Sequence, residues 1–167
     1  MHKFLGAAAA LGLMTTAACG GGSDGPPAAD GGDAEAEAPA DDAETAEAPS
    51  ADSTDTIDGT VYADFTGDAT AGEAVFAQCR TCHVMDPGVN RTGPSLHNIV
   101  GREAGQVEGF NYTDANANSG IVWTPEKLFQ YLENPARIIP NTRMAFAGLP
   151  EAQDRADLIA YLETYSE

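Results

Sequence analysis

The sequence of 167 residues has few basic side chains: eight Lys and Arg stand against 26 Asp and Glu, a formal net charge of −18. Because the phosphates of nucleic acid would repel so acidic a chain, nucleic acid is excluded as a partner. Cysteine is also scarce, with three residues. One stands alone at Cys19, and Cys79 and Cys82 are separated by two residues. This number and spacing argue against a disulfide-built scaffold.

Long hydrophobic runs are missing as well. The apolar run at residues 4–14 is too short to cross a bilayer as a helix, which needs about 20 apolar residues. It follows the positive Lys3 and precedes small residues, a pattern typical of an export signal. Because Cys19 stands at the cleavage point, the segment resembles a bacterial lipoprotein signal. We expect a signal peptide at residues 1–18 and a lipidated Cys19. The alternative is ordinary cleavage, with Cys19 an incidental thiol.

Large apolar residues are almost absent from the stretch that follows. Between Gly20 and Asp58 the chain has twelve carboxylates, no Lys or Arg, and Ile57 as its one large apolar residue. Such a stretch cannot bury enough apolar surface to offset the entropy of ordering the chain. We therefore predict an acidic disordered linker at residues 19–62, which tethers a folded domain at residues 63–167.

One motif in the predicted domain carries chemistry, the run Cys79-Arg80-Thr81-Cys82-His83. A Cys-x-x-Cys pair followed directly by His is typical of covalent haem attachment, in which the thiols bond the haem vinyl groups and the imidazole binds iron. A structural zinc site would need a second pair of Cys or His ligands at suitable spacing. A thioredoxin-like dithiol would follow a strand in a βαβ unit. Both alternatives fit the surroundings of Cys79 less well than a c-type haem site.

Further segments resemble the mitochondrial-type class I cytochromes c, in the order and spacing of that family. The resemblance covers about residues 67–165 and is carried by Thr92-Gly93-Pro94-Ser95-Leu96-His97, Gly101-Arg102, Gly109-Phe110-Asn111-Tyr112-Thr113-Asp114-Ala115-Asn116, Trp123, Tyr131-Leu132-Glu133-Asn134-Pro135, Ile139-Pro140-Asn141-Thr142-Arg143-Met144-Ala145-Phe146-Ala147-Gly148 and Asp157-Leu158-Ile159-Ala160-Tyr161-Leu162. It implies an all-α class I cytochrome c fold, with the terminal helices packed across each other around one covalent haem c and its iron.

The resemblance assigns Met144 as the second axial ligand, on the haem face opposite His83. A thioether ligand favours Fe(II) and so raises the reduction potential. Met1 and Met14 belong to the leader, and Met85 is too close to His83 to reach the opposite face. The resemblance also implies further cofactor-binding residues, namely Pro94 as acceptor for the His83 imidazole, Arg102, Tyr112 and Trp123 at the haem propionates, Thr113 at a neighbouring contact, and Asn116, Tyr131 and Thr142 near Met144. His97 is expected to be a surface or structural histidine.

Three helices are expected in the domain. Residues 72–78 can form an apolar face with helical spacing. Thr124 and Pro125 are typical of an N-cap and first turn, and the helix they open should end near residue 133, before Pro135. A last helix at about residues 152–163 has its large apolar residues at helical spacing. By the resemblance, this helix packs across the first one near Gly72, where glycine permits close approach.

These features predict a periplasmic monohaem cytochrome that carries single electrons, is not an enzyme, and is anchored to a bacterial membrane through Cys19. Two filled axial positions leave no place for a substrate, which favours a carrier. A haem peroxidase or ligand sensor with a labile Met144 is one alternative, and a non-haem lipoprotein with a structural metal site is another. The expected partners are respiratory or photosynthetic membrane complexes, such as a quinol–cytochrome c oxidoreductase and a terminal oxidase. The protein is expected to be a monomer.

Overall fold

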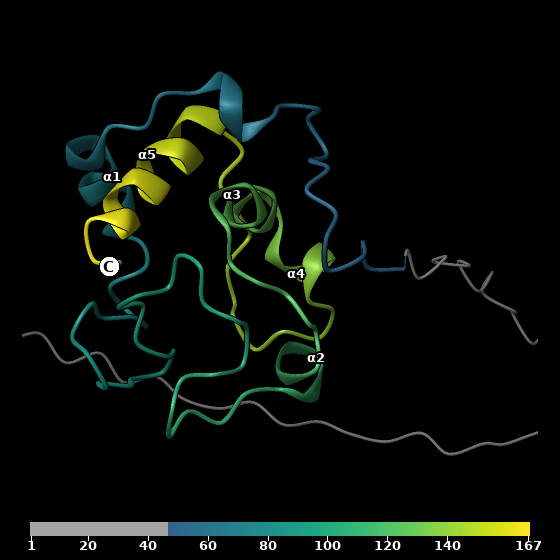
Figure 1. The fold of residues 1–167 in the computed structure, drawn as a ribbon, viewed down its shortest axis with the longest axis vertical. Helices are drawn as coiled ribbons and strands as arrows, with labels where there is room; N and C mark the ends of the chain where they lie inside the picture. The colour runs from purple at the N-terminus through teal and green to yellow at the C-terminus, as the bar shows by residue number, and fades with distance from the viewer. Residues whose placement is uncertain (1–46) are drawn as a thin grey trace, which may run out of the picture. The chain divides into compact units, whose positions relative to one another are not determined.

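A computed structural model of the chain describes residues 47–167. Its helices in chain order are α1 (Ala69–Phe76), α2 (Asp114–Ala117), α3 (Pro125–Glu133), α4 (Pro135–Ile138) and α5 (Ala152–Glu163), with a 3-10 turn η1 (Tyr62–Asp64) before them. Within residues 47–167, β-structure is confined to one isolated bridge between Glu103 and Val122. Figure 1 shows α1 against α5, with α3 beside them and a long loop region between α1 and α2. The described part of the chain is therefore all-α, as predicted.

The two terminal helices of the domain, α1 and α5, cross in close contact (Figure 1). Gly72 lies at the crossing, where a Cβ atom would come within 1.9 Å of the Asp157 carbonyl oxygen. The rings of Phe76 and Tyr161 pack further along the same interface, with centroids 5.2 Å apart. The missing side chain at Gly72 therefore sets how closely the helices approach, as the sequence predicted.

Helix α1 begins and ends earlier than the helix predicted at residues 72–78. Asp68 caps it, because its Oδ1 accepts hydrogen bonds from the backbone N–H groups of Thr70 at 2.7 Å and Ala71 at 3.3 Å. After Phe76 the chain continues in turns, and the Cys79 N–H donates to the Phe76 carbonyl at 2.8 Å. The two cysteines and the histidine of the motif therefore lie on turns that follow α1, rather than on the helix itself.

Helix α3 has the start and end that the sequence predicted. Thr124 is its N-cap, with Oγ1 accepting from the Lys127 N–H at 3.2 Å, and Pro125 occupies the first turn. The backbone of Asn134 is extended, which ends the helix before Pro135. Helix α5 likewise matches its predicted range. Together with α1 and the loops, these helices enclose a core that includes Phe76, Ile99, Ile121, Trp123, Leu128, Phe129, Leu132, Ile138, Ile139, Leu149, Leu158, Ile159 and Leu162.

Residues 47–62 differ from the disordered linker expected there. Their carbonyl groups accept hydrogen bonds from side chains of α3 and α4, and the Asp58 carboxylate accepts from Arg155 of α5. The ring of Tyr62, at the end of this stretch, packs on Phe129 of α3 with centroids 5.8 Å apart. Composition did not show this order, because main-chain groups rather than large apolar side chains make most of the contacts. The rest of the expected linker, the signal peptide and Cys19 lie outside the described residues. Among residues 47–167, no helix is both long and apolar enough to cross a bilayer.

Candidate haem site

A cavity of about 710 Å³ lies between the helices and the loop region. Its wall is largely apolar, with contributions from α1, α3 and α5, and its size is typical of a cofactor pocket. Every residue predicted to bind the cofactor lines this cavity, namely Cys79, Cys82, His83, Pro94, Arg102, Tyr112, Thr113, Asn116, Trp123, Tyr131, Thr142 and Met144. The fold thus brings together residues spread over more than a third of the sequence.

His83 is held in a fixed orientation at the cavity wall. Its Nδ1 lies 2.8 Å from the Pro94 carbonyl oxygen, so Nδ1–H donates there and Nε2 is the nitrogen left for a metal. Gly93 lies against the ring, since a Cβ atom on it would come within 2.4 Å of the His83 Cε1. Burial lowers the pKa of His83, although the hydrogen bond to Pro94 opposes this. The surroundings therefore favour the neutral imidazole, the form that binds metals.

The two cysteines lie beside His83 on the turns after α1. Both are half-buried and line the cavity. The His83 N–H donates to the Cys79 carbonyl at 2.9 Å, and the Gly93 N–H donates to the Cys82 carbonyl at 2.9 Å. Burial, with a smaller contribution from Cys82, raises the pKa of the Cys79 thiol to about 11. These turns hold both thiols and the imidazole at one part of the wall, as covalent haem attachment requires.

Met144 lies on the segment between α4 and α5 and contacts two polar side chains. The Tyr131 hydroxyl donates to its Sδ at 3.7 Å, and its own N–H donates to Thr142 Oγ1 at 3.2 Å. Burial raises the pKa of Tyr131 to about 12, while a hydrogen bond with Thr142 lowers it. Tyr131 is therefore a protonated donor at any ordinary pH, and it fixes the thioether without carrying charge.

Arg102 and the carbonyl groups that it binds form another polar part of the cavity wall. Its guanidinium donates to the carbonyl oxygens of His97 at 2.8 Å and Ser95 at 3.1 Å. Burial lowers the pKa of Arg102, whereas Tyr112 raises it. This guanidinium remains charged, because the ordinary pKa of arginine is above 12. Main-chain carbonyls thus hold a half-buried cation at the cavity, in a place where an anionic substituent would be stabilised.

Other predicted residues serve the fold as well as the cavity. The rings of Trp123 and Tyr131 pack with centroids 4.7 Å apart. Thr113 caps α2 by accepting from the Asn116 N–H at 3.3 Å. The side-chain Oδ1 of Asn116 is buried and has no hydrogen-bond partner among residues 47–167. An amide with unmet hydrogen-bonding capacity in the wall fits a cavity that a partly polar cofactor fills.

The residues present therefore fit a haem: two thiols, an oriented imidazole, a thioether, a cation and a mainly apolar wall. The family model for cytochrome c matches residues 69–166. The chain belongs to the cytochrome c family. Cytochrome c type-1 of Ascaris suum is 55% identical over 98 residues, which cover 58% of this chain and 88% of that protein. Cytochrome c2 of Rhodopila globiformis is 50% identical over 99 residues, covering 59% of this chain and 93% of that protein.

A solved structure agrees with this assignment. Cytochrome cH from Methylobacterium extorquens is similar to the chain with a TM-score of 0.56 and 40% identity, covering 59% of this chain and 99% of that one. The class I cytochrome c fold is thereby confirmed, together with covalent haem c and its iron as the cofactor. Its relatives are electron carriers and not enzymes, so the chain is a monohaem electron-transfer protein. The non-haem alternative is wrong.

Part of the cavity does not follow from the sequence. Gly93 has no predicted role, although the ring of His83 leaves no room for a side chain there. Most of the apolar wall was not predicted either; it comprises Phe76, Leu96, Ile99, Phe110, Leu128, Leu132, Phe146, Leu158 and Leu162. The helical spacing in α3 and α5 marks some of these as inward-facing. That spacing alone does not distinguish a residue that faces a cofactor from one that faces another side chain.

Proposed function

We propose that this cytochrome holds its haem through thioether bonds from Cys79 and Cys82, and that His83 and Met144 are the axial ligands. The observation that carries the proposal is that both thiols, the imidazole and the thioether line one cavity. Each proposed ligand is also held by a second group, Pro94 for His83 and Tyr131 for Met144. When bound, the haem takes up and gives back single electrons.

The chain's own residues suit this role by keeping the site closed. Pro94 and Gly93 fix the plane of the His83 ring, so its Nε2 stays aimed at one point. Tyr131 and Thr142 hold the Met144 segment in the same way from the other part of the wall. The apolar lining excludes water. With both axial positions filled, a substrate has no iron site to occupy, which favours a carrier over a peroxidase or ligand sensor.

We place the domain in the periplasm, tethered to the membrane by an acylated Cys19 and the acidic residues that follow it. Support comes from the export pattern of residues 1–19. It also comes from the relatives, which include a bacterial cytochrome c2 and cytochrome cH. The division of the chain into signal peptide, linker and cytochrome domain belongs to the same proposal.

The proposed partners are membrane redox complexes, such as a quinol–cytochrome c oxidoreductase and a terminal oxidase. Arg143, exposed at the cavity wall, and the exposed Arg91 are available for docking to acidic partners. Two of the three candidate arginines are also held by main-chain carbonyls: Arg143 donates to Asn111 at 2.6 Å, and Arg137 donates to Asp55 at 3.1 Å. Steady reduction of the purified cytochrome by such a complex, followed by optical absorption, tests this part of the proposal.

The axial assignment is tested with Met144→Ala, with Met85→Ala as the matched control. Met85 packs against the core but does not line the cavity. Wild type and Met85→Ala are expected to be low-spin in the ferric state and to bind cyanide slowly. Met144→Ala should become high-spin and bind cyanide rapidly, because it has lost an iron ligand. A high-spin wild-type protein that binds cyanide rapidly would refute the carrier proposal.

The attachment and anchoring residues are tested by intact mass spectrometry of the mature protein. We expect the mass to include one haem and the acyl groups on Cys19. Replacing both Cys79 and Cys82 with Ser should remove the haem mass and leave the acyl mass. Cys19→Ser should do the reverse. An unmodified Cys19 in the wild-type protein would refute the anchor while leaving the haem proposal intact.

A further inference from the structure

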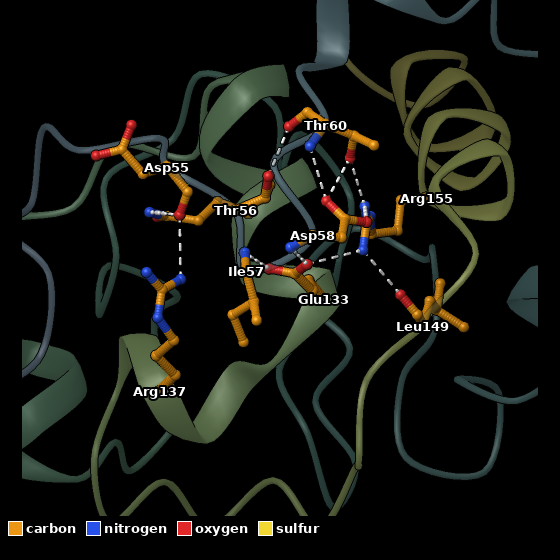
Figure 2. A network of polar contacts seen from close by, with 10 residues as sticks. Asp55, Thr56, Ile57, Asp58, Thr60, Glu133, Arg137, Leu149 and Arg155 are labelled. Carbon is orange, nitrogen blue, oxygen red and sulfur yellow. Dashed lines mark hydrogen bonds and ion pairs between the residues drawn. The ribbon is translucent and has the colours of Figure 1, made fainter. Parts of the chain in front are cut away.

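Residues 50–66 form an N-terminal strap that precedes the part of the chain matched by the cytochrome c family model, which begins at residue 69. The strap runs beside α3 and reaches α5 before the chain enters α1 (Figure 1). Figure 2 shows the polar contacts that bind its central residues to these helices. Since the haem ligands belong to the matched part, the strap is an addition to a fold that already contains its own site.

The first half of the strap covers two buried polar side chains of α3. Lys127 is 2% exposed, and its Nζ donates to the carbonyls of Ser50 at 3.2 Å and Ser53 at 2.8 Å, and to Gln130 Oε1 at 2.7 Å. Gln130 is 0% exposed and donates to the Asp55 carbonyl at 2.9 Å. A buried ammonium without acceptors would be costly. The strap's main chain supplies most of the acceptors that these side chains need.

The second half of the strap binds Arg155 of α5. Arg155 is 0% exposed, and its guanidinium stacks on the Phe129 ring at 4.5 Å from the centroid. It donates to Asp58 Oδ2 at 2.5 Å and to Thr60 Oγ1 at 2.9 Å. Glu133 of α3 lies 3.5 Å from the same guanidinium and accepts from the backbone N–H of Asp58 at 2.9 Å. Strap, α3 and α5 thus share one network, visible in Figure 2.

The same guanidinium also reaches the segment that carries Met144. Arg155 donates to the Leu149 carbonyl at 3.2 Å, and the Leu149 N–H donates to the Leu132 carbonyl of α3 at 2.7 Å. At the neighbouring Gly148, a Cβ atom would come within 2.0 Å of the Glu133 carbonyl oxygen. The end of this segment is therefore fixed against α3, five residues beyond Met144. Figure 2 shows Asp58, Arg155 and Leu149 in sequence along this connection.

We infer that Asp58 is a positioning residue for Met144. It holds the Arg155 guanidinium in the orientation that binds the Leu149 carbonyl, and so keeps the segment that carries the thioether against α3. This inference rests on the proposed role of Met144 as an iron ligand. Without the Asp58 carboxylate, Arg155 retains Glu133 as its one anionic partner in the network, at a longer distance. The hold on Leu149 weakens, and Met144 leaves the iron more readily.

The test compares full-length haem-loaded proteins: wild type, Asp58→Asn and Asp64→Asn. Asp64 lies in the same strap and is exposed, so its replacement changes the net charge equally without touching Arg155. The measurement is the affinity of the ferric protein for imidazole, which competes with Met144 for iron. Loss of a charge-assisted hydrogen bond should raise that affinity about tenfold in Asp58→Asn. Asp64→Asn should stay within about twofold of wild type.

A role confined to stability would give a different result. Asp58→Asn would then unfold at lower urea concentration, while imidazole affinity under native conditions would equal that of wild type. That outcome overturns the inference. Thr60→Val, which removes a second acceptor from Arg155, should raise the affinity in the same direction and decides the matter if Asp58→Asn does not fold. A wild-type protein without Met144 ligation would overturn the proposed function and this inference together, whereas unchanged affinity in both variants overturns the inference alone.

Discussion

The haem cavity and the N-terminal strap lie against the same helices but are held by opposite kinds of contact. Apolar side chains from α1, α3, α5 and the loops between them make most of the cavity wall, with a few polar groups at defined points. The strap is held mainly by polar contacts. Its carbonyl groups accept from buried Lys127 and Gln130, its N–H groups donate to Glu133, and its Asp58 and Thr60 side chains accept from buried Arg155. A cavity of this kind depends on which side chains are present, whereas main-chain contacts are available to almost any sequence.

The variant expected to have the largest effect is Gly72→Val, at the crossing of α1 and α5. It tests how far the stability of the domain depends on the close packing of these helices. A Cβ atom there would lie 1.9 Å from the Asp157 carbonyl oxygen, so the helices must separate. We expect the free energy of unfolding of the haem-loaded protein to fall by at least about 3 kcal/mol, measured by urea denaturation.

The matched control for that variant is Gly59→Ala in the strap. A Cβ atom at Gly59 meets no atom within 4 Å, although its φ of +74° disfavours other residues. Only the backbone cost remains, about 1 kcal/mol. If the free energy of unfolding fell equally in the two variants, the helix crossing would tolerate a side chain as well as an open turn does.

Deleting residues 47–62 from the full-length protein measures how much the strap contributes to the stability of the domain. Lys127, Gln130 and Arg155 would lose the partners that the strap provides, although water can replace some of them. We expect the free energy of unfolding to fall by about 2–3 kcal/mol while haem attachment and its absorption bands persist. A deletion of equal length at residues 25–40 controls for chain length. Unchanged stability would mean that the strap contributes nothing to the domain.

The smallest expected effect is the loss of stability when the Asp58 carboxylate is protonated at low pH. Burial alone would raise the pKa of Asp58, but hydrogen bonds from Thr60 and Arg155 outweigh it and hold this pKa well below its usual range. The groups that face Asp58 are Arg155 of α5, Glu133 of α3 and Thr60 of the strap. Because the folded-state pKa is depressed, the stabilisation from the Asp58 carboxylate is present above its unfolded value of about 3.9 and is lost as the pH falls below it.

This acid effect is measured as the difference between wild type and Asp58→Asn in urea denaturation at pH 6 and at pH 3. Both proteins contain Glu133, so the difference between them isolates Asp58. The Asp58 side chain is 34% exposed, and solvent screening should limit the loss to about 1 kcal/mol. A difference that does not change with pH would show that the ion pair with Arg155 contributes no net stability.

Helices were predicted most accurately where a local sequence pattern is typical of one structure only. Thr124 before Pro125 predicted the start of α3, and the spacing in residues 152–163 predicted α5. Gly72 at the helix crossing followed from the family resemblance, as did nine of the residues that line the cavity, whereas Cys79, Cys82 and His83 followed from the attachment motif. Helices α2 and α4 were not predicted, because four residues are too few to show a periodicity.

The strap could not be predicted, for a related physical reason. Up to residue 60 its side chains are mostly small or acidic, which is also the composition of a disordered segment. Its order depends on partners far away in the sequence, such as Arg155 for Asp58 and Lys127 for the Ser53 carbonyl. A basic residue in a helix is ordinarily solvent-exposed, so neither cation indicated that it would be buried under a distant part of the chain.

The crossing of α1 and α5 also has a consequence for the order of folding. The attachment motif follows α1 directly, while α5, whose Leu158 and Leu162 line the cavity, lies near the far end of the chain. Contacts between such distant segments close a long loop, and they form later and more slowly than local turns. A chain emerging N-terminus first therefore presents Cys79 and Cys82 before α5, which completes the cavity wall, has formed.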